Sequence, residues 1–260
     1  MVAYSTDKVR LLDHFRKDPA LFAYHIGDLD PFHFDLCSWA VLPDESGWIE
    51  ECILFYRGLA TPTVLAFGLG ERFEDFLVEL MPELPPSFFG HFQERSREVL
   101  TRAYRLTDYG NNYKMQLMDF KPAALSIDRD NIVSLTPDHL PLLEELYSEA
   151  YPGNFFMPRM LESGKYLGYM EQDHLAAVTG VHVYSEEFGV CALGNITTHP
   201  SYRNRGLATQ LTSVLLEQVT AKNLAVCLNV RVVNAAAIKS YQKLGFEIVH
   251  EYREGLLEKA

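Results

Sequence analysis

The stretch that decides the fold is THPSYRNRGLATQLTSVLLEQV, residues 198–219. A proline, two arginines and a glycine stand just before an amphipathic run, whose apolar residues keep helical spacing: Leu207, Leu211, Val214, Leu215 and Val219. The residues before it, VCALGNITTHP at 190–200, have strand character, and Pro200 prevents a regular ladder from continuing. The stretch therefore predicts a strand, a loop and a helix in succession.

A loop of this kind is a predicted anion site. The first N–H groups of a helix have no partners within it, and the helix dipole is positive at that end. Gly206 and Ala208 are small enough to let a phosphate approach the backbone, and Arg203 and Arg205 add positive charge. The segment RNRGLA is therefore interpreted as a pyrophosphate cradle, and a purely structural turn is the alternative for this loop taken alone.

Other phosphate-binding and nucleophile motifs do not fit. The pattern GxxxxGK[ST] is absent, and FGLGERF at 67–73 has Phe73 where the third glycine of GxGxxG belongs. No GxSxG is present, so a serine hydrolase of that type is not indicated.

The flanking sequence divides into two halves near Pro122. In the second half the patterns predict strands at 131–137, 166–173, 175–187, 190–200 and 224–233, and helices at 137–153, 158–164 and 234–245. A last strand at 246–252 is expected before a charged tail. The first half predicts helices at 7–18, 71–81 and 93–107, and strands at 38–43, 48–58, 61–68 and 111–120. The similar order is a weak sign of duplication.

Two motifs together resemble the GNAT superfamily of acyl-CoA-dependent N-acyltransferases. Arg203, Gly206 and Ala208 match [RQ]xxGx[GA], and Asn234 is followed by a helix that ends in YQKLGF from Tyr241. The resemblance covers roughly residues 132–252. It implies an α/β (α+β) fold with a mixed, mostly antiparallel central sheet flanked by helices, in two tandem GNAT-like units. Residues 1–122 would be a degenerate domain without the cofactor motif, and residues 123–260 the catalytic acyltransferase domain.

The resemblance also implies acetyl-CoA as co-substrate and no metal. In the family, the loop amides bind the CoA pyrophosphate, and the strand before the loop parts from the next strand to pair with the pantetheine arm. Asn234 matches the asparagine that faces this arm, and capping of the helix that begins there is a compatible role. The matching cofactor residues are Ile196, Thr197, Thr198, Arg203, Arg205, Gly206, Leu207, Ala208, Thr209, Asn234, Ala237 and Tyr241.

Tyr241 matches the family tyrosine that protonates the departing thiolate. A thiol has a pKa of about 8.5 and an unperturbed tyrosine about 10, so this transfer is feasible. The expected reaction is direct attack of a primary amine on acetyl-CoA in a ternary complex. A packing role for Tyr241 is one alternative, because it shares a helix face with Ala237, Ile238 and Leu244. A non-catalytic acyl-CoA-binding or regulatory module is another, although such a module would not need Tyr241.

The sequence leaves the general base and the acceptor site open. Candidate bases on or between the relevant strands are His182, Glu186, Glu187 and Asn195, and His182 also fits a structural role. The loop at 153–160 offers Phe155, Phe156 and Met157 as an acceptor-pocket wall, with core packing as the alternative. Because little sequence follows the strand at 246–252, the segment at 111–120 is expected to supply a further wall.

Composition and charge restrict the class of protein. Of 260 residues 48% are hydrophobic, enough for a core, yet no apolar run approaches the ~20 residues of a membrane span. The N-terminus is charged and lacks a signal-peptide pattern, and the four cysteines form no CxxC pair, so we expect reduced thiols in a cytoplasmic protein. The net charge of −12 argues against nucleic-acid binding.

Basic residues are nevertheless concentrated near the two motifs. Between residues 201 and 246 there are six basic residues and one acidic residue, which favours a small anionic ligand. Elsewhere, His33, Asp35 and Cys37 alternate in HFDLC and would share one face of a strand, but three ligands without a fourth do not predict a metal. The expected partner is a small-molecule or peptide amine, and both a monomer and a homodimer remain open.

Overall fold

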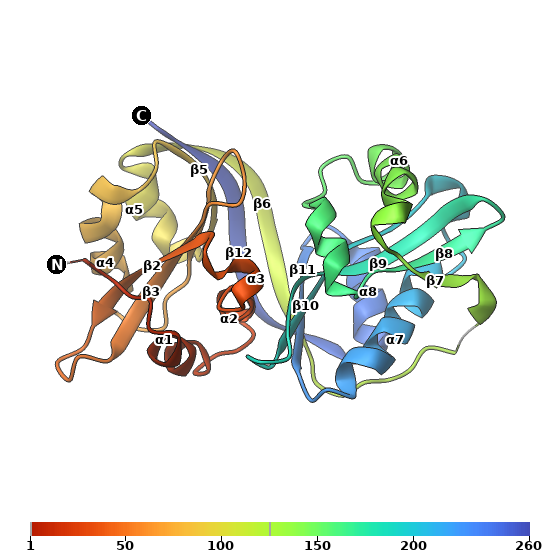
Figure 1. Ribbon diagram of the computed structural model, residues 1–260. Coiled ribbons are helices and arrows are strands. Elements are labelled where there is room, and N and C mark those ends of the chain that lie inside the picture. The colour runs from red at the N-terminus through yellow and green to blue at the C-terminus, as the bar shows by residue number, and fades with distance from the viewer. Residues whose placement is uncertain (1, 125) are drawn as a thin grey trace. The chain divides into compact units, whose positions relative to one another are not determined.

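The computed structural model describes residues 2–124 and 126–260. The chain forms two compact units. The first consists of Met1–Lys114, Val230–Val233 and Ile248–Ala260, and the second of Met115–Asn229 and Asn234–Glu247. Each contains a mixed, mostly antiparallel sheet flanked by helices (Figure 1), which is the fold class that the sequence predicts.

The second unit is built on five strands in the order β11-β10-β9-β8-β7. They are β7 (Ile132–Ser134), β8 (Leu167–Glu171), β9 (His174–Ser185), β10 (Val190–Thr198) and β11 (Ala225–Arg231). The pair β10–β11 is parallel and the other neighbours in this order are antiparallel; α7 (Leu207–Thr220) is the crossover helix that a parallel pair requires. Figure 1 shows α7 on one face of this sheet and α6 (Leu140–Ala150) on the other.

Burial explains why α7 is a helix at this place. Leu211, Leu215, Leu216 and Val219 are completely buried, as the predicted amphipathic pattern requires. Shorter elements complete the unit: η3 (Arg129–Asn131), η4 (Pro137–His139), η5 (Pro158–Ser163), η6 (Pro200–Tyr202) and α8 (Ala235–Lys243). The helices and strands predicted between residues 131 and 245 are confirmed, with shifted ends.

The first unit has the strand order β1-β2-β3-β4-β5-β12-β6. The strands are β1 (Ala3–Tyr4), β2 (Cys37–Pro43), β3 (Ile49–Tyr56), β4 (Thr63–Ala66), β5 (Ser87–Phe92), β6 (Tyr104–Leu117) and β12 (Phe246–Lys259), of which β6 and β12 extend a few residues into the second unit. Parallel β4 and β5 are joined by α4 (Phe73–Leu80). The order β3-β4-α4-β5 therefore repeats the order β9-β10-α7-β11 of the second unit.

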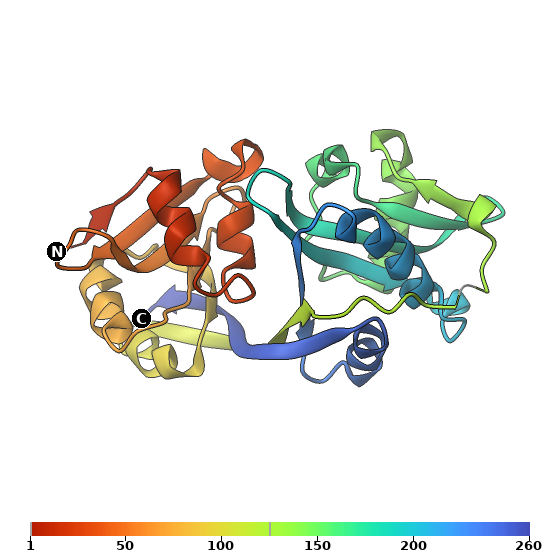
Figure 2. The same ribbon diagram turned by 90° about the horizontal axis from the view of Figure 1, so that it is seen from below.

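Helices cover both faces of the first unit's sheet. On one face Phe73, Phe76, Leu77 and Leu80 of α4 belong to a core cluster with residues of β2, β3 and β5. The other helices are α1 (Lys8–Phe15), α2 (Ala23–Gly27), α3 (Pro31–Phe34) and α5 (Arg97–Thr101), with the short turns η1 (Met81–Glu83) and η2 (Glu94–Ser96). Figure 2 shows α1 and α2 on the face opposite α4.

The sequence predictions for the first unit need correction at several points. The helix expected at 93–107 ends at Thr101, and Tyr104 begins β6, where its buried hydroxyl donates to the carbonyls of Leu84 and Pro85. The strand β5 was not predicted, because it is short and its buried face, with Phe88 and Phe92, includes Gly90 in place of an apolar side chain. The expected charged tail is wrong, since β12 continues to Lys259.

Antiparallel pairing with β5 explains why the tail is a strand. The register runs from Arg253 opposite Phe92 to Glu258 opposite Ser87, and Leu257 is completely buried in the first unit's core. Residues 248–260 therefore complete the first unit's sheet, although they lie far beyond the boundary that was expected near Pro122. Within the described ranges, no helix is long and apolar enough to cross a membrane.

Buried histidines make the first unit sensitive to acid. His14 and His25 are 1% and 0% exposed; burial lowers the pKa of His14 to about 4 and that of His25 well below its usual value. Because the unfolded pKa is about 6.5, the unfolded chain binds the extra protons, so stability is full above pH ~6.5 and falls towards pH 4. For His14 alone the loss is about 3 kcal/mol.

Guanidinium unfolding followed by tryptophan fluorescence measures this loss, because both tryptophans, Trp39 and Trp48, belong to the first unit. We expect His14→Phe, whose ring would pack among Phe15 and Phe22, to flatten the decline between pH 6.5 and 4. An unchanged slope in this variant would show that His14 is not a source of the acid sensitivity.

Candidate active site

Strand β10 separates from β11 halfway along its length. The two strands pair from Val190 opposite Ala225 to Leu193 opposite Leu228, whereas β10 continues to Thr198 beside β9 alone. Residues 194–198 therefore have no register partner in β11. An unpaired strand edge presents backbone donors and acceptors to which an extended ligand can add as a further strand.

A bulge at Asn195 accompanies this separation. The register between β10 and β9 shifts between Gly194 and Thr197, and Asn195 has a φ of 55°, a left-handed conformation that asparagine tolerates better than most residues. Its side-chain amide donates to Tyr166 Oη at 2.9 Å and to the Phe155 carbonyl at 3.2 Å. Tyr147 Oη donates to the Asn195 carbonyl at 2.9 Å. Asn195 thus holds the bulge, and its side-chain amide is a hydrogen-bonding group that does not take up a proton near neutral pH.

His182 lies at the beginning of the unpaired segment. Its ring covers Gly194 so closely that a Cβ at Gly194 would stand 2.0 Å from His182 Cδ2. The ring of Phe155 lies 6.0 Å away, in an edge-on arrangement. Among the four candidate bases, the structure therefore brings His182 and Asn195 to the place where β10 leaves β11.

The acidic candidates lie at the opposite end of the strand pair. Glu186 and Glu187 occupy the turn between β9 and β10. Glu186 accepts a hydrogen bond from Tyr184 at 2.6 Å and pairs with Lys222 at 3.2 Å, and these contacts lower its pKa. A carboxylate held this way is a weak base, so Glu186 is poorly suited to accept a proton at the separated end.

The loop after β10 leaves the amides of α7 open. Gly206 is the N-cap with a φ of 76°, a conformation that glycine adopts without strain, and it gives no side-chain cap. Within residues 2–124 and 126–260, nothing accepts a hydrogen bond from the N–H groups of Leu207, Ala208 or Thr209. The first turn of α7 also contains no acidic residue. These are the features that an anion-binding helix end requires.

The two arginines of the loop differ in their surroundings. Arg205 pairs with Glu171 at 2.9 Å, a contact that raises the arginine's pKa, and its guanidinium lies 5.5 Å from the Tyr202 ring centre. Arg203 is exposed and donates from Nε to the Thr198 carbonyl at 3.3 Å. Of the two arginines beside the open amides, Arg205 is held by an ion pair and a ring contact, whereas Arg203 contacts a main-chain carbonyl.

Helix α8 presents Tyr241 on a face that is only half-buried. Asn234 Oδ1 accepts from the Ala237 N–H at 3.2 Å, so the capping role is confirmed. No side chain of α8 is fully buried, which weakens the alternative that Tyr241 is a packing residue. Burial of its hydroxyl, together with neighbouring Tyr151, raises the pKa of Tyr241. The phenol is therefore protonated at neutral pH, and the raised pKa also makes it a weaker acid towards a thiolate than an unperturbed tyrosine.

The loop at 153–160 divides between surface and interior. Phe155 is exposed beside His182, whereas Phe156 is half-buried between Tyr147 and Tyr166, with ring centroids 5.3 and 5.7 Å away. Met157 is also half-buried. Tyr147 and Tyr166, which the sequence analysis did not single out, therefore fix both this loop and the bulge.

The segment at 111–120 passes from the first unit into the second at Met115. Met118 N donates to the Gly245 carbonyl and Lys121 N to the Leu244 carbonyl, each at 3.0 Å. A Cβ at Gly245 would lie 1.8 Å from the Asp119 carbonyl oxygen, so the glycine is required for this close approach. The segment lies beside the end of α8, and its role as an acceptor wall remains a prediction.

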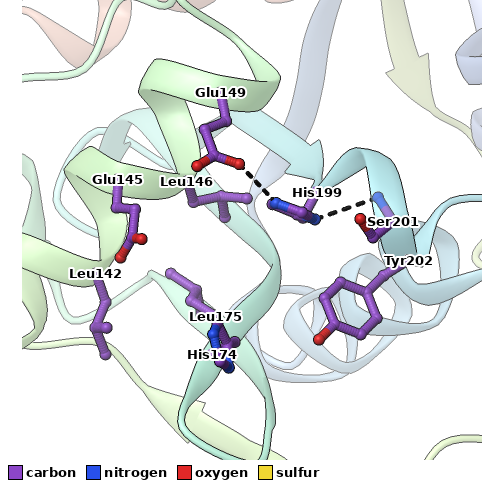
Figure 3. Close-up of a pocket in the computed structure, with 9 residues that line it drawn as sticks. All are labelled: Leu142, Glu145, Leu146, Glu149, His174, Leu175, His199, Ser201 and Tyr202. Atoms are coloured by element: carbon purple, nitrogen blue, oxygen red, sulfur yellow. Dashed lines mark hydrogen bonds and ion pairs between the residues drawn. The ribbon is translucent and has the colours of Figure 1, made fainter.

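A pocket of about 340 Å³ lies beside the loop on the α6 side (Figure 3). Glu149 pairs with His199 Nε2 at 2.8 Å, and His199 Nδ1 accepts from the Ser201 N–H at 3.2 Å. The lining residues are Leu142, Glu145, Leu146, Glu149, His174, Leu175, His199, Ser201 and Tyr202. No local sequence pattern predicts this pocket, because its residues come from three separate segments.

The residues of HFDLC do not share a strand face. His33 is in α3 and Cys37 begins β2, with Asp35 between these elements. Cys37 Sγ donates to the His33 carbonyl at 3.4 Å. In the part of the chain that the structure describes, no three His, Cys, Asp or Glu side chains are placed to hold a metal ion.

Comparisons with known proteins identify a family for part of the chain and a fold for the whole of it. Residues 132–246 match the model of the Acetyltransferase (GNAT) family. No curated protein matches the sequence. A solved Drosophila protein superposes with a TM-score of 0.76 at 13% identity, over 99% of this chain and 98% of its own.

Two further solved structures show the same fold. For a GCN5-related N-acetyltransferase from Sphaerobacter thermophilus the TM-score is 0.61 at 14% identity, over 98% of this chain and 94% of its own. For a tandem GNAT protein from the clavulanic acid biosynthesis pathway it is 0.58 at 13% identity, over 98% of each chain. At these identities the likeness is one of fold.

Proposed function

Residues 132–246 are a GNAT-family acetyltransferase domain, and from that premise we propose that this protein transfers an acetyl group from acetyl-CoA to a primary amine. One observation carries the proposal. The open amides of α7 directly follow the part of β10 that is not paired with β11. A site for a diphosphate at the amides would therefore adjoin a site for an extended, amide-containing arm at the strand edge.

The proposed binding follows these two features. The diphosphate would accept hydrogen bonds from the amides of residues 205–209, with Arg203 and Arg205 supplying positive charge. The pantetheine arm would pair with the free edge at Ile196, Thr197 and Thr198. The side-chain amide of Asn234 would face this arm, because the cap uses only its oxygen; Ala237 would line the same arm from α8.

The proposed reaction is a direct attack of the neutral amine on the thioester carbonyl in a ternary complex. The C–N bond forms, the C–S bond breaks, and the thiolate takes a proton from the Tyr241 hydroxyl. An N–H donor on the edge of β10 would stabilise the carbonyl oxygen as negative charge develops on it. The amine loses its proton to a base.

His182 is the base that the geometry favours. It stands over Gly194, where the unpaired edge begins, and exposed Phe155 beside it could contact an acceptor. A neutral imidazole has one ring nitrogen that can accept a proton, which is why histidine often serves as a general base. Glu186 and Glu187 lie at the wrong end of the strands.

We expect His182→Gln to lower kcat/KM for the amine at least about 10-fold, since general base catalysis contributes this much or more. The acidic limb of the pH–rate profile should also flatten, while the Kd for acetyl-CoA stays unchanged. His174→Gln, at the exposed start of the same strand, is the matched control. If the pH–rate profile of His182→Gln kept its acidic limb, the general base would be a residue other than His182.

The activity itself is tested by mixing the protein with acetyl-CoA and a panel of small amines, polyamines, amino acids and peptides, and measuring free thiol. Release of thiol that depends on one amine class supports the transferase. Tight acetyl-CoA binding without thiol release for any amine would favour the alternative, a non-catalytic acyl-CoA-binding module.

A further inference from the structure

The first unit contains a second strand–loop–helix segment of the same topology. Strand β4 is followed by the loop at 67–72, by α4, and by β5, which is parallel to β4. The pairing differs from that in the second unit. All four residues of β4 pair with β5, from Thr63 opposite Phe89 to Ala66 opposite Phe92, so no unpaired edge leads into this loop.

A buried carboxylate occupies the loop. Glu51 of β3 is 0% exposed, and its two oxygens accept hydrogen bonds from the N–H groups of Leu69 at 3.1 Å and Gly70 at 2.5 Å. A Cβ at Gly70 would lie 2.8 Å from Glu51 Oε1, so the glycine permits the close approach. Two backbone amides thus bind one carboxylate, as amides of an anion-binding loop do.

Further charges surround the loop. The Arg95 guanidinium donates to the carbonyls of Gly68 at 2.7 Å and Gly70 at 2.9 Å, and pairs with Glu74 at 3.2 Å. The first turn of α4 contains Glu74 and Asp75, whereas that of α7 has no acidic residue. A diphosphate at α4 would meet these two carboxylates in addition to Glu51.

We propose that the loop at 68–70 is an anion-binding site whose resident ligand is the chain's own Glu51 carboxylate. The first unit therefore binds no diphosphate, and the chain has one acyl-CoA site, at α7, a count that rests on the proposed function. The chemical class that the site accepts is a small carboxylate. The sequence FGLGERF does not reveal this site, because the carboxylate that binds there comes from a strand about 18 residues earlier.

Chemical rescue tests the site. We expect Glu51→Ala to lower the thermal midpoint of the first unit by about 5 °C, measured by fluorescence of Trp39 and Trp48. Sodium acetate should restore about half of this loss by binding in the vacated place, while sodium chloride at equal ionic strength should not. In the wild-type protein, acetate and chloride should change the thermal midpoint of the first unit by the same amount.

Glu51→Gln is the matched control. Its side chain fills the same volume and keeps one acceptor, so we expect a smaller loss of stability and no specific response to acetate. If Glu51→Ala does not fold alone, the refolded fraction is measured with acetate and with chloride, and a gain with acetate supports the proposal. An acetate effect no larger than the chloride effect in Glu51→Ala overturns it.

Stoichiometry gives an independent check. Calorimetric titration of the wild-type protein with acetyl-CoA should give one site per chain, and two sites would overturn the proposal. The acetate experiment does not use acetyl-CoA. A protein that binds no acetyl-CoA would therefore refute the proposed function, while acetate rescue of Glu51→Ala would still support the internal ligand.

Discussion

An Ala208→Glu variant is expected to bind acetyl-CoA at least about 100-fold more weakly, a loss of roughly 2.7 kcal/mol. The substitution places a carboxylate in the first turn of α7, where the amides of Leu207, Ala208 and Thr209 are open. The carboxylate would compete for these amides and repel the diphosphate. An acidic residue at a helix N-terminus stabilises the helix, so the variant should fold.

Calorimetry with acetyl-CoA measures this effect, and circular dichroism verifies the fold. Gln218→Glu is the matched control, because it adds the same charge to an exposed position near the other end of α7. Its affinity should stay within about 2-fold of the wild-type value, since an exposed charge more than a Debye length away is screened. Equal losses in both variants would indicate an effect of net charge, and no loss in Ala208→Glu would remove α7 from the binding site.

A Tyr241→Phe variant is expected to lower kcat at least tenfold while the Kd for acetyl-CoA stays near normal. The substitution removes the proton donor to the thiolate and leaves the ring, which packs 6.0 Å from Phe246. Thiol release under saturating acetyl-CoA measures kcat, and calorimetry measures binding.

Tyr109→Phe, an exposed tyrosine of the first unit, controls for loss of a phenol elsewhere and should retain full activity. Tyr151→Phe is informative because Tyr151 contributes to the raised pKa of Tyr241. Full turnover in Tyr241→Phe would exclude Tyr241 as the proton donor.

The sequence predicted the second unit well because its signals are local. The spacing of Leu207, Leu211 and Leu215 predicted α7, and Asn234 marked the start of α8, where it caps the helix. Gly206 was identified as a small residue in the loop before the helix, and its left-handed backbone, with a φ of 76°, was learned only from the structure. In each case the relevant contacts lie within a few residues along the chain.

Features that depend on distant residues were not predicted. The bulge at Asn195 is held by Tyr147, Phe155 and Tyr166, which come from other elements. The continuation of β12 depends on pairing with β5, more than 150 residues earlier, and its charged side chains conceal the alternation with Leu257. Glu51 had no local pattern, because a lone acid within an apolar strand does not reveal which amides it binds.

The last strand has a consequence for how the chain folds during its synthesis. Residues 248–259 of β12 lie between β5 and β6 in the first unit's strand order, so the ribosome makes the edge partner of β5 only after the whole second unit has been translated. Domains generally fold in the order in which they are made. Here all residues of the second unit are translated before β12, the neighbour of β5. The sheet of the first unit, which is translated first, is therefore completed last.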